Sequence, residues 1–119
     1  MKYILDTHTF IWFSEDDKKL SRTAAKAITN KSNECFISIV SLWKISIKCN
    51  LGKLTLLAPF SSIYGFLKEN KIEILPIEFS HLQTLLELEH FHKDPFDRLI
   101  VAQTITENIT IITSDSNIA

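Results

Sequence analysis

The sequence predicts an α/β domain in which a parallel sheet of about four to five strands carries helices on both faces. Short apolar segments alternate along the chain with longer segments that begin at helix-capping residues, and this alternation is typical of parallel sheets. The first apolar segment, Tyr3-Ile4-Leu5, lacks the polar–apolar alternation of a half-exposed strand, as expected for a strand buried on both faces. The chain has 119 residues, enough for one core, so residues 1–119 are expected to form a single domain.

The first part of the chain predicts two strands separated by two short helices. The first strand covers Lys2 to Leu5, and a helix from about Thr7 to Phe13 follows it. Ser21 is a good N-cap, because its side chain can accept a hydrogen bond from the first helical turn, and it predicts a helix from Arg22 to about Asn30. The second strand is expected from Glu34 to Ile37.

The middle of the chain predicts two helices with clear terminal signals. Ser38 is expected to cap a long helix that runs to about Cys49, and Gly52 lies just past its end. Pro59 fits the first turn of the next helix, expected from Phe60 to about Asn70, because a helix leaves its first N–H groups unpaired in any case.

The last part of the chain predicts a strand, two helices and a final strand. The strand is expected from Ile72 to Pro76, and Ser80 begins a helix that runs to about Glu89. Asp94-Pro95 begins another helix that runs to about Glu107. The closing strand is expected from Ile109 to Ile112.

Composition narrows the class of protein. The net charge is −1, so a nucleic-acid ligand would need a local basic patch rather than a global basic field. No apolar segment approaches the roughly 18–20 residues that span a bilayer, and Asp6 interrupts the N-terminal apolar run, which argues against a signal peptide. Cys35 and Cys49 lack the spacing of a zinc site and are expected to be reduced, so the sequence is typical of a cytoplasmic protein.

Four aspartates lie where strands are expected to end or helices to begin, namely Asp6, Asp94, Asp97 and Asp115. In an open parallel sheet these positions share one edge, where ligands bind. Carboxylates gathered there would suit a hard divalent cation. Each aspartate also has a structural interpretation: Asp6 and Asp94 as helix caps, Asp97 as an acid in a first helical turn, and Asp115 in an Asx-type turn.

Several segments of the chain look familiar, and the most specific is Asp94-Pro95-Phe96-Asp97-Arg98. The others are Ile4-Leu5-Asp6-Thr7-His8, residues 38–48 with Gly52-Lys53-Leu54, residues 92–103, and Thr113-Ser114-Asp115. Together they resemble the PIN domain, and most closely the VapC-like toxin ribonucleases of bacterial toxin–antitoxin pairs. The resemblance covers essentially the whole chain. Because members of this family usually run on past the last segment, the chain is expected to be short by nature or to lack its tail.

The resemblance implies a metal-dependent endoribonuclease that hydrolyses RNA phosphodiester bonds. Asp6, Asp97 and Asp115 would hold Mg²⁺ or Mn²⁺, with Asp94 close by. The resemblance also implies a small antitoxin protein and a homodimer as partners. The residues expected to line the site are Thr7, Ser41, Arg98 and Thr113.

Lys44 departs from the resemblance, because the family usually has Glu at this position. An ammonium there would pair with Asp6 or Asp97 and repel a dication. The chain could therefore be a weakened or inactive nuclease, a non-catalytic module that binds RNA or an antitoxin, or a nuclease detoxified during cloning. An exposed Lys44 that faces away from the site would have no such effect.

Two further interpretations remain at this stage. Trp12 and Phe13, with the segment from Leu54 to Tyr64, could line a groove for an amphipathic antitoxin helix. A phospho-acceptor receiver domain also gathers aspartates and a lysine at a sheet edge, but the acidic pair that it needs after the first strand is missing here.

Overall fold

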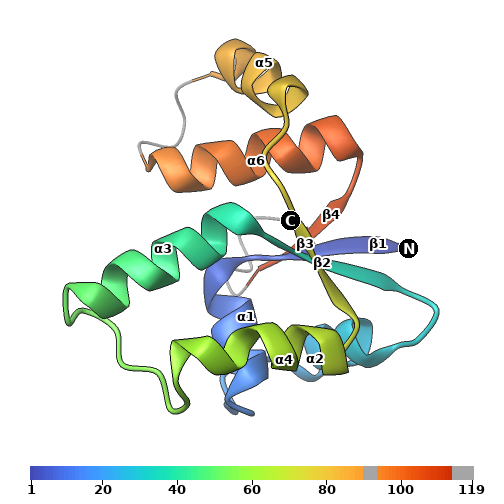
Figure 1. The fold of residues 1–119 in the computed structure, drawn as a ribbon. Coiled ribbons are helices and arrows are strands. Elements are labelled where there is room, and N and C mark those ends of the chain that lie inside the picture. Colours follow the sequence, from blue (N-terminus) through green and yellow to red (C-terminus); the bar gives the residue numbers. More distant parts are fainter. Residues whose placement is uncertain (90–93, 114–119) are drawn as a thin grey trace.

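The fold is seen in a computed structural model that describes residues 1–89 and 94–113. Four parallel strands form one sheet in the order β3-β2-β1-β4, which confirms the predicted α/β class (Figure 1). Leu5 of β1 pairs with Ile37 of β2 and with Ile112 of β4, so these strands end at the same edge. The strands are β1 (Lys2–Leu5), β2 (Glu34–Ser38), β3 (Ile72–Leu75) and β4 (Thr110–Ile112).

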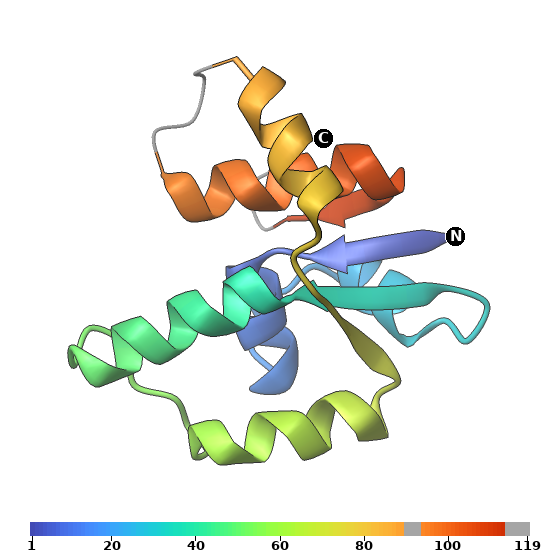
Figure 2. The same cartoon turned by 45° about the horizontal axis from the view of Figure 1, so that its top comes forward.

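Helices cover both faces of the sheet, as predicted. The helices α1, α2 and α4 lie on one side, whereas α6 lies on the other side and carries α5 on its outer surface (Figures 1 and 2). A 3₁₀ turn, η1 (Phe60–Ser62), precedes α4. The α-helices are α1 (Thr7–Ser14), α2 (Arg22–Thr29), α3 (Ile39–Asn50), α4 (Ile63–Glu69), α5 (Phe79–Glu87) and α6 (Pro95–Glu107).

Neighbouring residues of the central strand β1 point into two separate cores. Leu5 packs with Phe10, Ile37 and other apolar side chains from α1 to α4. Ile4, on the opposite face of the strand, packs with Val40 and with Ile100 of α6. Since successive side chains of a strand alternate between faces, a strand buried on both sides needs apolar residues at every position.

Most predicted helix termini are confirmed. The Ser21, Ser38 and Asp94 side chains accept N–H groups from the first turns of α2, α3 and α6. Gly52 has φ of +71° just past α3, where the left-handed conformation is least costly for glycine. The helix expected to start at Ser80 instead starts at Phe79, where the Glu78 N–H donates to Nδ1 of His81 at 2.9 Å.

Among the helices of the described residues, none is both long enough and apolar enough to cross a membrane.

Candidate active site

Asp6 lies at the carboxyl end of β1, and both of its carboxylate oxygens accept hydrogen bonds. Oδ1 accepts the Thr9 N–H at 2.7 Å, which caps α1, and Oδ2 accepts the Thr113 hydroxyl at 2.6 Å. The Asp6 N–H donates to the Ile112 carbonyl at 3.0 Å. Asp6 is therefore both a helix cap and the residue that ties the ends of β1 and β4 together.

Lys44 faces the acidic residues at the start of α6. Its Nζ donates to Oδ2 of Asp94 at 2.8 Å and lies 3.7 Å from Oδ1 of Asp97. The Lys44 side chain is only 15% exposed, whereas those of Asp94 and Asp97 are 36% and 52% exposed. The interpretation of Lys44 as an outward-facing helix residue is therefore wrong, and its ammonium pairs with Asp94 rather than with Asp6.

Asp94 has two roles at once. Oδ1 accepts the Phe96 N–H at 2.8 Å and caps α6, while Oδ2 accepts the Lys44 ammonium. Partial burial raises the pKa of the Asp94 carboxyl, but the hydrogen bonds from Lys44 and from the Phe96 and Asp97 N–H groups outweigh burial. The pKa of Asp94 therefore lies below its ordinary value of 3.8, and the carboxylate stays ionised beside the lysine.

Aromatic side chains lie beside the Lys44 ammonium. The Phe96 ring lies 5.8 Å from Nζ of Lys44, within the range of a cation–π contact. The Trp43 ring meets Phe96 at 4.9 Å and an interplanar angle of 68°, an edge-to-face arrangement. These contacts join α3 to the first turn of α6 and limit the freedom of the lysine to swing toward solvent.

The predicted site-lining residues fall into two groups. Thr7 donates to Ser41 at 3.0 Å, and Ser41 is fully buried, so this pair links the first turn of α1 to α3 beside Asp6. Arg98 instead donates to the carbonyls of Leu88 and Glu89, at 3.4 and 2.8 Å. Its guanidinium is thus directed toward the end of α5, and no acid of the described residues pairs with it.

The described residues do not fit a divalent cation as they lie. Within residues 1–89 and 94–113, no three His, Cys, Asp or Glu side chains are close enough to hold a metal together. The predicted ligand Asp115 lies outside the described residues, so the predicted set of Asp6, Asp97 and Asp115 stays a prediction. Lys44 already pairs with Asp94 and lies near Asp97, which offsets part of their negative charge, and both oxygens of Asp6 accept hydrogen bonds.

The predicted groove between the first helix and the segment 54–64 exists, but with other lining residues. A pocket of about 300 Å³ lies between α1 and α4, and Ile11, Leu57 and Ile63 are among its lining residues. Trp12 is not one of them; it contacts His8 and Lys19. Phe13 packs on Phe66 at 5.7 Å and lines a different cavity. Trp12 and Phe13 therefore do not line this pocket, and their role in binding an antitoxin stays a prediction.

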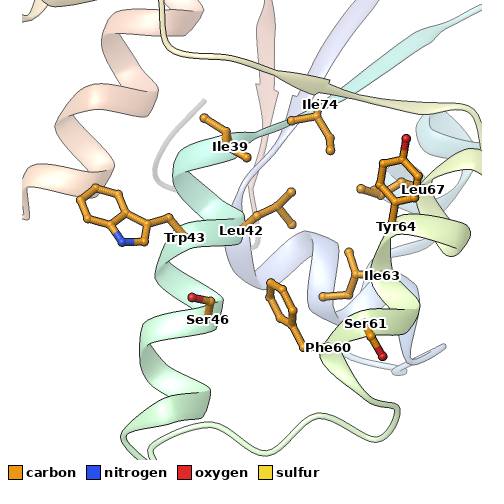
Figure 3. A pocket seen from close by; sticks show the side chains of 10 residues that line it. All are labelled: Ile39, Leu42, Trp43, Ser46, Phe60, Ser61, Ile63, Tyr64, Leu67 and Ile74. Carbon is orange, nitrogen blue, oxygen red and sulfur yellow. The ribbon is translucent and has the colours of Figure 1, made fainter.

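A second apolar pocket, of about 360 Å³, lies between α3 and α4 and was not predicted (Figure 3). Tyr64, Trp43 and Phe60 are among its lining residues. The side chains of Trp43 and Phe60 are 54% and 42% exposed. The signal in the sequence was the i, i+3, i+4 spacing of Ile39, Leu42 and Trp43, which puts these apolar side chains on one face of α3.

Comparison with known proteins gives three findings. The profile of the PIN domain matches residues 3–119. The chain is 28% identical to ribonuclease VapC22 of Mycobacterium tuberculosis over 113 residues, which cover 94% of this chain and 85% of that protein. It also superimposes, with a TM-score of 0.71 and 20% identity, on the crystal structure of VapBC2 from Rickettsia felis bound to a DNA fragment from its promoter, covering 98% of this chain and 90% of that one.

Proposed function

Because the chain belongs to the PIN-domain family, we propose that it is the toxin of a VapBC-type toxin–antitoxin pair, an endoribonuclease of the cytoplasm whose activity Lys44 weakens. The similarity to ribonuclease VapC22 supports RNA hydrolysis as the reaction. The main evidence that Lys44 weakens nuclease activity is its 2.8 Å ion pair with Asp94. The same ammonium also lies 3.7 Å from Asp97.

The charge at this edge explains why Lys44 matters for RNA hydrolysis. A divalent cation, Mg²⁺ or Mn²⁺, held by Asp6, Asp97 and Asp115 would supply an activated water and stabilise the charge on the phosphodiester. In this chain Lys44 neutralises part of the carboxylate charge that would attract such an ion. Replacing a carboxylate by an ammonium changes the local charge by two units, and each close charge pair is worth about 4 kcal/mol at ~4 Å and an effective dielectric of ~20, before relaxation.

A second function is favoured by the same ion pair. With Lys44 held between Asp94 and Asp97, the chain would act as a non-catalytic PIN module that binds RNA or an antitoxin without cutting. Binding that persists in a chelator, with no cleavage in any divalent cation, distinguishes this function from a weakened nuclease.

The two pockets beside α4 support a protein partner. Ile63 lines both of them, so they adjoin along α4. Tyr64 is 61% exposed and Leu57 is 81% exposed, and such side chains are suited to anchor a partner helix. The antitoxin is proposed to bind across these two pockets with its apolar side chains.

An exposed apolar stripe on α5 supports a homodimer. Phe79, Leu82 and Leu86 follow helical spacing and are 74%, 46% and 86% exposed. A second copy of the chain would bury this stripe by presenting the same stripe to it, as in a two-fold symmetric interface.

RNA cleavage by the protein and its Lys44→Glu variant, compared in Mg²⁺, in Mn²⁺ and in a chelator, tests the proposed function. In Mg²⁺ or Mn²⁺ the variant is expected to cut RNA at least tenfold faster than the protein itself. In the chelator it is expected not to cut. Asp97→Asn in the Lys44→Glu background should remove that activity. If neither protein cuts any tested RNA, the non-catalytic function takes the place of the nuclease; if both cut equally, Lys44 does not control activity.

A further inference from the structure

We infer that the ammonium of Lys44 is the resident cation of this acidic edge, so that the protein folds without divalent metal and keeps Mg²⁺ and Mn²⁺ away from Asp94 and Asp97. This inference concerns metal occupancy and folding rather than RNA cleavage. It can therefore be tested by measurements that need no RNA and no antitoxin.

The Nζ of Lys44 lies among acidic and aromatic groups. Within the described residues, its polar and aromatic partners belong to the cap and first turn of α6: Asp94 at 2.8 Å, Asp97 at 3.7 Å and the Phe96 ring at 5.8 Å. An ammonium offers three donors to such a set. Lys44 itself lies in the middle of α3, so its side chain bridges two helices that approach each other at the carboxyl edge (Figure 1).

The Lys44 side chain is mostly buried. Only 15% of it is exposed to solvent. A lysine that loses hydration on burial is stable only while its partners compensate for that loss. The lysine is thus committed to Asp94 and Asp97, unlike a surface lysine that could leave them for water at little cost.

A competing Mg²⁺ ion would be poorly coordinated beside Lys44. Mg²⁺ requires near-ideal octahedral oxygen coordination and gives up its water reluctantly. Beside Lys44 it would meet a positive charge a few ångströms away, the Asp94 carboxylate that already accepts two hydrogen bonds, and the Asp97 carboxylate already paired with the same ammonium. The Lys44 ammonium, unlike Mg²⁺, does not have to be bound from solution, because it is covalently part of the chain and reaches Asp94 when the protein folds.

Mn²⁺ binding and thermal unfolding test this inference in four proteins: the full chain, Lys44→Glu, Lys44→Met and the control Lys53→Met. Lys53 is exposed and forms no ion pair within the described residues, so its replacement makes the same charge change away from the edge. Electron paramagnetic resonance counts free Mn²⁺, and unfolding is followed in Mn²⁺, in Mg²⁺ and in a chelator.

The full chain and Lys53→Met are expected to retain no Mn²⁺ and to unfold at the same temperature in metal and in chelator. Lys44→Met should unfold about 4–8 °C lower than the full chain, because Asp94 and Asp97 lose their partner. Lys44→Glu should be the least stable in chelator, should bind Mn²⁺, and should recover several degrees when Mn²⁺ is added.

Three results would overturn the inference. The first is stoichiometric Mn²⁺ binding by the full chain, a measurement that requires no variant to fold. The second is a Lys44→Met protein as stable as the full chain. The third is a folded Lys44→Glu protein that binds no Mn²⁺ and unfolds at the same temperature with and without it. That result would mean that something other than Lys44 excludes the metal. None of these results depends on finding the right RNA, so failure here and failure of the nuclease proposal are separate.

Discussion

Thr113 donates its hydroxyl to the Asp6 carboxylate at 2.6 Å, joining residues 107 positions apart in the sequence. The bond links the residue after β4 to the residue after β1, at the edge where these parallel strands end. It also fixes the Asp6 carboxylate while its other oxygen caps α1. The first and last strands of the described fold are therefore joined by a side chain of the candidate site itself.

Replacing Thr113 with Val should lower the free energy of unfolding by about 1–3 kcal/mol, because the partly buried Asp6 oxygen loses a donor that Val cannot replace. Urea unfolding followed by circular dichroism measures the loss. Thr113→Ser, which keeps the hydroxyl, is the matched control and should lose less. Because Val keeps the threonine methyl group and lacks only the hydroxyl, a Thr113→Val protein as stable as the original would show that this hydrogen bond contributes nothing to stability.

The fully buried His81 should be neutral, with its proton on Nε2. Nδ1 accepts the Glu78 N–H at 2.9 Å and so cannot carry a proton, while Nε2 lies 2.8 Å from Oε2 of Glu107. Nitrogen NMR of the imidazole at neutral pH should report this tautomer. A signal typical of imidazolium, or of a proton on Nδ1, would contradict the hydrogen-bond pattern.

His81→Leu should destabilise the protein by about 1–3 kcal/mol, because it leaves Glu107 and the start of α5 without their partner. The variant should also increase hydrogen exchange in α5 more than in the sheet, since this side chain links α5 to α6. Uniform loss of protection throughout the chain would show instead that His81 supports the whole core.

The stabilisation from the pair of Lys44 and Asp94 should disappear in acid. The pKa of Asp94 is lowered in the folded state, so its contribution is present above the ordinary value of 3.8 and is lost as the pH falls through the lower folded value. The difference in unfolding free energy between the protein and Lys44→Met should thus be constant above pH ~5 and fade below pH ~4. Because Asp94 is 36% exposed, the expected difference is modest. A difference that stays constant down to pH ~2 would exclude this carboxylate as its source.

Antitoxin binding and dimerisation should respond to different surfaces. Tyr64→Asp, between α3 and α4, should weaken antitoxin binding at least tenfold and leave the oligomeric state unchanged, because it removes an apolar anchor and introduces a charge. Leu86→Asp, on the exposed stripe of α5, should disrupt the dimer and leave antitoxin binding unchanged. Calorimetry measures the affinity and light scattering the mass. Trp12→Ala, which lies outside both pockets, is the control that should bind normally.

The sequence by itself determined the order of the elements and most of their ends. Ser21, Ser38 and Asp94 cap helices through hydrogen bonds to residues two or three positions later, so the information is local. The continuous apolar run of β1 likewise fixed a strand that is buried on both faces. These features reach only a few residues along the chain, which is why they can be predicted without knowing how the elements pack.

Only the tertiary structure decided which side chains meet. The partner of Lys44 is Asp94, 50 residues away, and that pairing depends on how α3 and α6 cross rather than on any local pattern. For the same reason Arg98 is directed to the end of α5, and Tyr64 lines a different pocket from the one predicted. A long side chain such as that of Lys44 can reach several neighbours. Which neighbour it contacts is decided by burial and by the packing of elements that are distant in sequence.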